Sequence, residues 1–231
     1  MANFNTHVTV AAVLSVPLAG ATFVLGMASM NDAVLYAIAG TFGGMLPDID
    51  ADESIAIRLV FRLFGALVAG LVVMTWLHRL PHWEVLFSAV TAYILVRFPV
   101  RWVFEALTVH RGALHSVLAN LMFAAVSVPI AHHFFHLSEK TAWGIGGFIF
   151  IGATIHLILD EMYSIDLSGM RIKRSFGTAL KLTDWSEPLA SLVLVFGCVI
   201  GYFFSPSPEY WLNTLGQLLS AAVSDGLHYF K

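Results

Sequence analysis

Long runs of apolar residues, separated by short polar segments, make up most of the chain. Most of these runs are close to the roughly 20 residues that a helix needs to cross the hydrocarbon core of a bilayer. The polar segments between them are too short to form a domain of their own. The pattern predicts about seven transmembrane helices, at residues 8–30, 33–46, 55–77, 83–103, 114–135, 143–159 and 188–204.

The last part of the chain has a different pattern, which begins after Pro206 and Pro208. Over residues 209–230, apolar side chains recur at helical spacing with polar side chains between them. A helix of this kind lies along the membrane surface with its apolar face in the lipid. We therefore expect a C-terminal interfacial amphipathic helix rather than an eighth span.

The composition supports a membrane protein. Of the 231 residues, 58% are hydrophobic and only 12% are charged, and the mean hydropathy is +0.79. A soluble domain has about twice that charged fraction. We predict an all-α, polytopic membrane helix bundle that forms a single domain over residues 1–231, with the candidate chemistry in residues 6–187. We expect no nucleic-acid partner, and the sequence does not indicate an oligomeric state.

The positively charged residues fall mostly on one side of the predicted topology. With seven crossings, nine of the twelve Lys and Arg residues lie on the side of the N-terminus: Arg58, Arg62, Arg97, Arg101, Arg111, Arg171, Lys173, Arg174 and Lys181. The other three are Arg79, Lys140 and Lys231. Cytoplasmic loops carry such an excess, so we expect a cytoplasmic N-terminus and a periplasmic C-terminus. The candidate histidines and aspartates described next fall on the cytoplasmic side.

His156 and Asp160 stand four residues apart in the sixth predicted helix. On a helix, side chains at this spacing share a face and point at one spot. Such a pair can give an imidazole and a carboxylate to one metal ion, or the carboxylate can orient the imidazole. The alternative interpretation is a histidine and an aspartate that are hydrogen-bonded to each other for packing alone.

Asp48 and Asp50 follow Pro47, which ends the second predicted helix. Paired carboxylates at such a position can chelate or bridge divalent ions. The alternative is an acidic turn in water, for which Asp52 and Glu53 are better candidates. The helix-ending proline directly before the two aspartates favours a ligand role for Asp48 and Asp50.

Two histidines, His110 and His115, flank Arg111 just before the fifth predicted helix. Burying so many ionisable groups is costly unless they are paired or bind a metal. The two histidines could reach one site if His110 lies in a turn and His115 in the first helical turn. Arg111 could hold a phosphate or a carboxylate through two parallel hydrogen bonds. An interfacial loop with titrating histidines is the alternative. His7, near the start of the first helix, is a weak candidate by itself.

Other polar side chains fit simpler roles. His78, His82, His132, His133 and His136 fall on the opposite side of the predicted topology, and we interpret them as interfacial residues. The one cysteine, Cys198, lies in an apolar run, so any metal must be held by nitrogen and oxygen ligands. Ser116 lacks the Gly-x-Ser-x-Gly turn of a serine nucleophile, which argues against covalent serine catalysis.

Taken in order, these motifs resemble those of one family. An N-terminal histidine, Leu-Pro-Asp-Ile-Asp at 46–50, His-Arg-Gly-x-x-His-Ser at 110–116 and His-x-x-x-Asp at 156–160 are similar to the YdjM-like family. Its members are LexA-regulated proteins of the bacterial inner membrane, classed as metal-dependent hydrolases. Leu114 stands where the family often has threonine, and residues 163–166 replace a Thr-Pro-x-Gly turn. The resemblance implies a bacterial inner-membrane location and metal-dependent hydrolysis.

A more distant similarity, in the types of ligand and their order only, is to zinc-dependent phospholipase C and related fungal nucleases. These are helical enzymes in which an N-terminal histidine, aspartates and a His-x-x-x-Asp/Glu helix surround clustered zinc ions. This similarity implies phosphoester hydrolysis.

Together these observations predict a membrane-bound metal-dependent hydrolase that acts on a phospholipid or a polyprenyl-phosphate ester at the cytoplasmic face. Zinc is the expected metal, with manganese or iron as alternatives. Arg111 is assigned as a clamp for the substrate anion, and Asp50 and His115 are also assigned to catalysis. The expected ligands, directly or through hydrogen bonds, are His7, Asp48, Asp50, His110, His115, His156 and Asp160. A divalent-cation transporter and a metal-stabilised protein without catalysis are the alternative functions.

Overall fold

The computed structural model describes residues 3–50, 54–107, 112–166, 171–172 and 180–228. The predicted all-α architecture is confirmed: apart from one antiparallel pairing of two-residue strands, β1 and β2, the regular structure of these residues is helical. In chain order the elements are α1 (Phe4–Val24), α2 (Met30–Gly43), η1 (Leu46–Asp50), α3 (Ile55–Trp76), α4 (His82–Leu95), η2 (Val96–Val100), α5 (Arg101–Leu107), α6 (Val117–Pro129), η3 (Ile130–Phe134), α7 (Glu139–Met162), β1 (Ile165–Asp166), β2 (Arg171–Ile172), α8 (Pro188–Phe203) and α9 (Glu209–His228).

Each of the seven predicted apolar runs contains a helix of the structure. Within the described residues, five helical segments are long and apolar enough to cross a membrane: Phe4–Val24, Ile55–Trp76, His82–Glu105, Val117–Phe134 and Glu139–Met162. The helices α2 and α8 have 14 and 16 residues, fewer than the roughly 20 that span the hydrocarbon core alone. Membrane-crossing helices are therefore present, while the count of seven stays a prediction.

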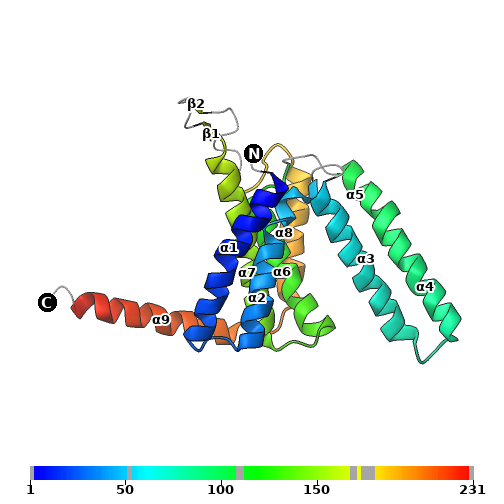
Figure 1. The fold of residues 1–231 in the computed structure, drawn as a ribbon, viewed down its shortest axis with the longest axis horizontal. Coiled ribbons are helices and arrows are strands. Elements are labelled where there is room, and N and C mark those ends of the chain that lie inside the picture. Colours follow the sequence, from blue (N-terminus) through cyan, green and yellow to red (C-terminus); the bar gives the residue numbers. More distant parts are fainter. Residues whose placement is uncertain (1–2, 51–53, 108–111, 167–170, 173–179, 229–231) are drawn as a thin grey trace.

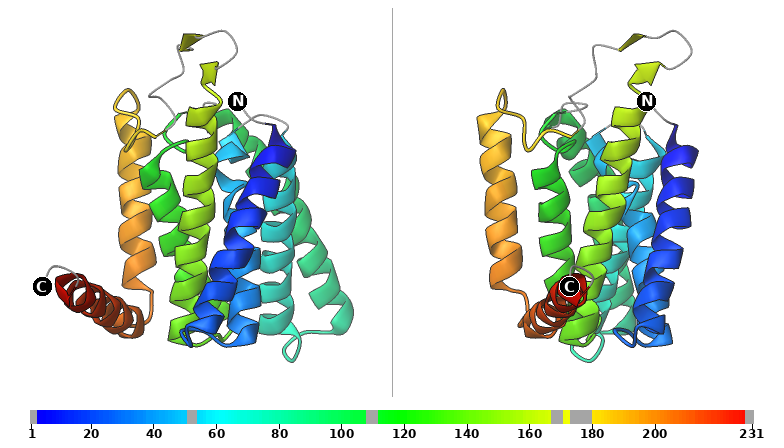
Figure 2. Two further views of the ribbon diagram at one scale, coloured as in Figure 1. Left: turned by 60° about the vertical axis from the view of Figure 1, so that its left-hand side comes forward. Right: turned by 90° about the vertical axis from the view of Figure 1, so that its left-hand side faces the viewer.

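The helices α1, α2, α6, α7 and α8 form the main bundle, with α7 at its centre (Figure 1, Figure 2). Half of the apolar window of α7 is buried, more than in any other candidate span of the described chain. The helices α3 and α4 form a hairpin that diverges from this bundle. We call the end that holds the start of α1, η1, the start of α6 and the end of α7 the upper end, as oriented in Figure 1.

Small residues let α1, α2 and α7 approach closely, as they do in many membrane proteins. A Cβ atom on Gly152 of α7 would overlap the backbone carbonyl of Gly40 in α2. A Cβ atom on Gly40 would in turn overlap Ser15 of α1. These contacts fix the depth of the three helices relative to one another. They therefore determine which side chains of the three helices meet at the upper end.

Local signals at the upper end explain where its helices begin. The side chain of Asn3 accepts a hydrogen bond from the backbone N–H of Thr6 at 2.8 Å and so caps α1. Ser116 caps α6 through the N–H of Ala119 at 3.2 Å. The first two N–H groups of α6, of Val117 and Leu118, donate to the carbonyls of Lys181 and Leu182, each at 3.0 Å. The segment 180–187 therefore lies across the start of α6.

The C-terminal helix α9 is attached at the opposite, lower end of the bundle. The indole N–H of Trp211 donates to the carbonyl of Lys140 at 2.8 Å, and the hydroxyl of Tyr210 donates to the carbonyl of Met27 at 2.9 Å. From there α9 runs across the direction of the bundle helices (Figure 1). Leu212 and Leu219 of this helix are exposed. This direction is consistent with the predicted interfacial helix.

Candidate metal centre

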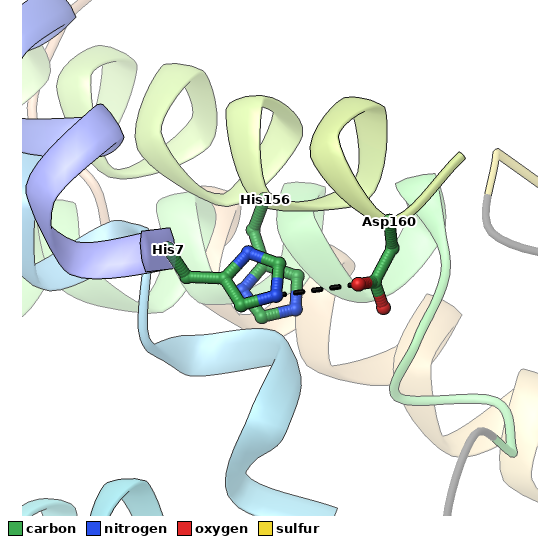
Figure 3. A group of neighbouring side chains, drawn as sticks. All are labelled: His7, His156 and Asp160. Carbon is green, nitrogen blue, oxygen red and sulfur yellow. Dashed lines mark ion pairs between the residues drawn. The ribbon is translucent and has the colours of Figure 1, made fainter. Parts of the chain in front are cut away.

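Four separate parts of the chain bring histidines and aspartates together at the upper end of the bundle. The first turn of α1 provides His7, and η1 provides Asp48. The turn before α6 provides His115, and the last two turns of α7 provide His156 and Asp160. We call these five residues the His/Asp cluster. Figure 3 shows His7, His156 and Asp160 pointing toward one another from α1 and α7.

Asp160 joins two of the histidines. One of its carboxylate oxygens lies 3.2 Å from Nε2 of His7, and the other lies 3.2 Å from Nε2 of His115. The dashed line in Figure 3 marks the first of these contacts. The ring of His156 stacks on that of His7, with centroids 3.6 Å apart and planes 12° apart, and meets the ring of His115 edge-on at 5.3 Å. The three imidazoles therefore form one packed group.

His156 is held in one orientation by the backbone. Its Nδ1 lies 2.8 Å from the carbonyl oxygen of Gly44, and because a carbonyl oxygen only accepts, Nδ1 must carry the proton. In the neutral ring, Nε2 then presents a lone pair, and it faces a carboxylate oxygen of Asp48 at 3.4 Å. A lone pair and an anionic oxygen repel unless a proton or a metal ion lies between them. Fixing one ring nitrogen in this way is how proteins orient a metal-binding histidine.

The cluster is buried. His7, His115, His156 and Asp160 are at most 2% exposed, whereas 17% of the side chain of Asp48 is exposed. Nδ1 of His7 and Nδ1 of His115 have no hydrogen-bonding partner among the described residues. Buried polar groups without a partner are costly, so a site that contains them fits an additional ligand.

The cluster's donor atoms suit a divalent metal ion. Two overlapping groups, one of His7, His156 and Asp160 and the other of Asp48, His115 and His156, each have ligand atoms within 4.8 Å of one another. Imidazole nitrogens with carboxylate oxygens are the donors that zinc accepts in catalytic sites. The residues present therefore fit a bound divalent ion, and His156 belongs to both groups.

The charge state of Asp48 follows from its surroundings. Burial raises the pKa of Asp48, but the facing ring of His156 and the positive charge that His156, His7 and His115 can carry lower it by more. The net result is a pKa below the ordinary value for aspartate. Asp48 is therefore an ionised carboxylate at neutral pH, as a metal ligand must be.

Of the seven ligands expected from the sequence, the structure brings five together in the His/Asp cluster. Asp50 is buried on η1, 1% exposed, but it belongs to neither group of potential ligand atoms. His110 and Arg111 lie outside the described residues. His115 precedes the N-cap Ser116 and lies in the turn before α6, not in the first helical turn as expected.

Two backbone features of the site had no signal in the sequence. The carbonyl of Gly44, rather than the carboxylate of Asp160, orients His156. The N–H of Ala113, two residues before His115, donates to a carboxylate oxygen of Glu187 at 3.3 Å. Both contacts join parts of the chain that are far apart in sequence, so a local pattern could not reveal them.

The histidines at the lower end make ordinary structural contacts. Nδ1 of His132 lies 2.8 Å from the carbonyl oxygen of Leu137, and Nε2 of His133 lies 2.9 Å from that of Phe204. Each of these rings thus uses a nitrogen to satisfy the backbone near a helix end. They serve below as controls for the His/Asp cluster.

These features define a class, namely helical membrane proteins with a buried His/Asp cluster at one end of the bundle. The sequence model of the YdjM inner membrane protein family matches residues 1–224. The chain therefore belongs to this family, and its inner-membrane character is established. No curated protein and no solved structure matches the chain.

Proposed function

We propose that this protein is a metal-dependent hydrolase of the inner membrane that cleaves a phosphoester in an amphiphilic substrate, a phospholipid or a polyprenyl-phosphate ester. The observation that carries the proposal is a cluster of three buried imidazoles, one buried carboxylate and the partly exposed carboxylate of Asp48 at one end of a membrane bundle. Such a cluster is costly to bury and has no need to exist for packing alone.

Zinc is the preferred metal because the donors are imidazole nitrogens and carboxylate oxygens. Manganese and iron accept the same donors and are the alternatives. His7, His156 and Asp160 would hold one ion, and Asp48 and His115 would complete or extend the site. When bound, a divalent ion lowers the pKa of a coordinated water to about 7 and polarises the bond to be cleaved.

The chain's own residues prepare the site in three ways. The Gly44 carbonyl fixes the ring of His156, so that Nε2 faces Asp48. Asp160 holds His7 and His115 from its two carboxylate oxygens. Burial excludes water from most of the cluster, and Asp48, with the most exposed side chain, marks the side from which the substrate enters.

An amphiphilic substrate suits the position of the cluster. The cluster lies at the upper end of the bundle (Figure 1), where two apolar candidate spans, Phe4–Val24 and Glu139–Met162, begin and end. A substrate can place its head group there while its tails remain in the lipid. Arg111, which belongs to the same sequence motif as His115, is proposed to bind the phosphate with its planar guanidinium group.

We propose that the upper end faces the cytoplasm and that the C-terminus lies in the periplasm. Arg58, Arg97 and Arg101 lie on helices near the upper end, whereas Lys140 lies at the start of α7, at the lower end. Cytoplasmic segments of membrane proteins carry the excess of such charges. The substrate would therefore be met in the cytoplasmic leaflet.

The test is to purify the full chain in nanodiscs and measure bound metal by mass spectrometry and hydrolysis of phospholipid and polyprenyl-phosphate esters. We expect at least about one zinc ion per chain. Turnover should stop when the zinc is removed by a chelator and return when zinc is added back. The control variant His132→Ala should keep both metal and turnover. Metal-dependent ion flux in proteoliposomes without hydrolysis would instead identify a transporter, and bound metal with neither activity a structural site.

A further inference from the structure

A buried amide lies deeper in the bundle than the His/Asp cluster. Asn120 of α6 is 0% exposed, and neither its Nδ2 nor its Oδ1 has a hydrogen-bonding partner among the described residues. A carboxamide offers two donors and an acceptor. Leaving all of them unpaired in an apolar interior is costly, and an aliphatic side chain of the same size would avoid that cost. A ligand therefore best accounts for a polar side chain at this position.

Helix packing sets the depth of Asn120. The helices α6 and α7 are antiparallel, and the carbonyl oxygen of Ala124 lies 3.1 Å from the position that a Cβ atom on Gly146 of α7 would take. Asn120 lies one helical turn nearer the upper end than Ala124 and on the same face, so it faces α7 near Phe150, four residues beyond Gly146. His156 lies six residues further along α7, a rise of about 9 Å. The backbone of Asn120 thus lies below the level of His156, beneath the cluster rather than beside it.

The direction of the side chain brings it closer still. In an α-helix the Cα–Cβ bonds tilt toward the helix N-terminus. The N-terminus of α6 is at the upper end, directly after His115, so the side chain of Asn120 leans toward the cluster. Ser15 of α1 leans in the same direction at the depth of Gly40, and its hydroxyl is also buried without a partner in the described part of the chain.

Thr154 provides a contrast on α7. Its hydroxyl oxygen is buried and likewise lacks a partner among the described residues. The N-terminus of α7 is at the lower end, however, so the side chain of Thr154 leans away from the cluster. Both residues therefore have a buried polar atom without a partner in the described part of the chain, while the direction of the side chain differs.

We propose that Asn120 is a further substrate-binding residue of this site, whose Nδ2–H donates a hydrogen bond to an oxygen of the bound phosphoryl group. This inference rests on the proposed function. The carboxylates of Asp48 and Asp160 can only accept hydrogen bonds, so they cannot bind a phosphoryl oxygen directly. A neutral amide supplies a donor on the inner side of the site without placing a further charge in the bundle, where charge is expensive.

The experiment uses the zinc-loaded full chain in nanodiscs and measures three quantities: zinc content, melting temperature and affinity for inorganic phosphate. The variants are Asn120→Leu, which keeps the volume, and Asn120→Ala, which fits without any clash. Thr154→Val is the control, because it removes a buried hydroxyl of the neighbouring helix whose side chain leans away from the cluster. We expect both Asn120 variants to keep zinc and melting temperature but to bind phosphate about ten-fold or more weakly, as for one hydrogen bond to a charged group. Thr154→Val should bind phosphate as the wild type does.

Three results would overturn the inference: wild-type phosphate affinity in the Asn120 variants, an equal loss in Thr154→Val, or a wild-type protein that loads zinc and binds no phosphate. Loss of zinc from both Asn120 variants would also overturn it, because the amide would then support the metal and not the substrate. The proposed function fails separately. If the wild type binds phosphate through Asn120 but hydrolyses no phosphoester, the hydrolase assignment is wrong and the anion-binding role of Asn120 stands.

Discussion

Replacing Asp160 by asparagine removes one charge from the centre of the cluster while keeping the size of the side chain. The wild-type carboxylate places one oxygen 3.2 Å from His7 and the other 3.2 Å from His115. Asparagine keeps one oxygen and turns the other contact into an N–H group that faces a ring nitrogen. The loss of one charge-assisted contact is worth about 1.5–3 kcal/mol. We therefore expect zinc affinity to fall by roughly 10- to 100-fold.

The assay is a zinc titration of Asp160→Asn against a competing fluorescent chelator, together with the melting temperature of the metal-free protein. The control is Asp32→Asn, which removes a carboxylate from the lower end, 3.8 Å from Lys140. It should leave zinc affinity unchanged, even if the loss of the helix cap that Asp32 makes with Ser29 lowers the melting temperature. Wild-type zinc affinity in Asp160→Asn, with the fold intact, would refute the assignment of Asp160 as a ligand.

Three further predictions follow from the fold and the motif. Gly152→Ala should lower the free energy of unfolding by about 1–3 kcal/mol, and with it the melting temperature, because its Cβ atom would overlap the Gly40 carbonyl. Gly147→Ala, which has open space at that position, should not lower it. Equal melting temperatures of the two variants would contradict the packing. Arg111→Lys should keep bound zinc but lower kcat/KM by roughly ten-fold or more, and normal turnover in this variant would exclude the phosphate clamp. A reporter that works only in the periplasm should be active when it is fused after Lys231, and a reporter that works only in the cytoplasm should be inactive there. The opposite result would reverse the topology.

The apolar pattern located the helices but not all of their ends. Hydropathy predicts the fifth helix at residues 114–135, yet α6 begins at Val117. Ala113 and Leu114 are apolar, so hydropathy alone extends the helix over them. The start is set instead by the cap of Ser116 and by carbonyls of the segment 180–187. The hydrogen bonds to the segment 180–187 join distant parts of the chain, so they leave no signal in the local sequence.

Capping also explains why the second helix begins earlier than the apolar run predicts. The apolar run suggested residues 33–46, whereas α2 spans Met30–Gly43. Ser29 and Asp32 form a reciprocal cap, so the helix begins at Met30, three residues before the apolar run. At the other end, the residues from Leu46 form η1, which carries Asp48 toward His156.

The candidate site was foreseen as a set of residues but not as a set of contacts. The spacing of His156 and Asp160 indicated that both point at one spot, and the structure places both in one group of potential ligands. The spacing could not indicate that Asp160 contacts His7 and His115, or that the Gly44 carbonyl orients His156. Those contacts depend on the close packing of α1, α2 and α7, which arises from glycine positions on separate helices. Asn120 has no signal in the sequence, because one amide inside an apolar run changes the mean hydropathy of that run very little.

Anomalous diffraction at the zinc edge from crystals of the zinc-loaded full chain tests the central claim most directly. We predict a peak at the upper end, about 2.0–2.2 Å from ring nitrogens of His7 or His156 and from a carboxylate oxygen of Asp160 or Asp48. The same measurement on Asp160→Asn should show a weaker peak at that position. A zinc-loaded crystal with its only peak at His132 and His133, or with no peak in the His/Asp cluster, would contradict the account.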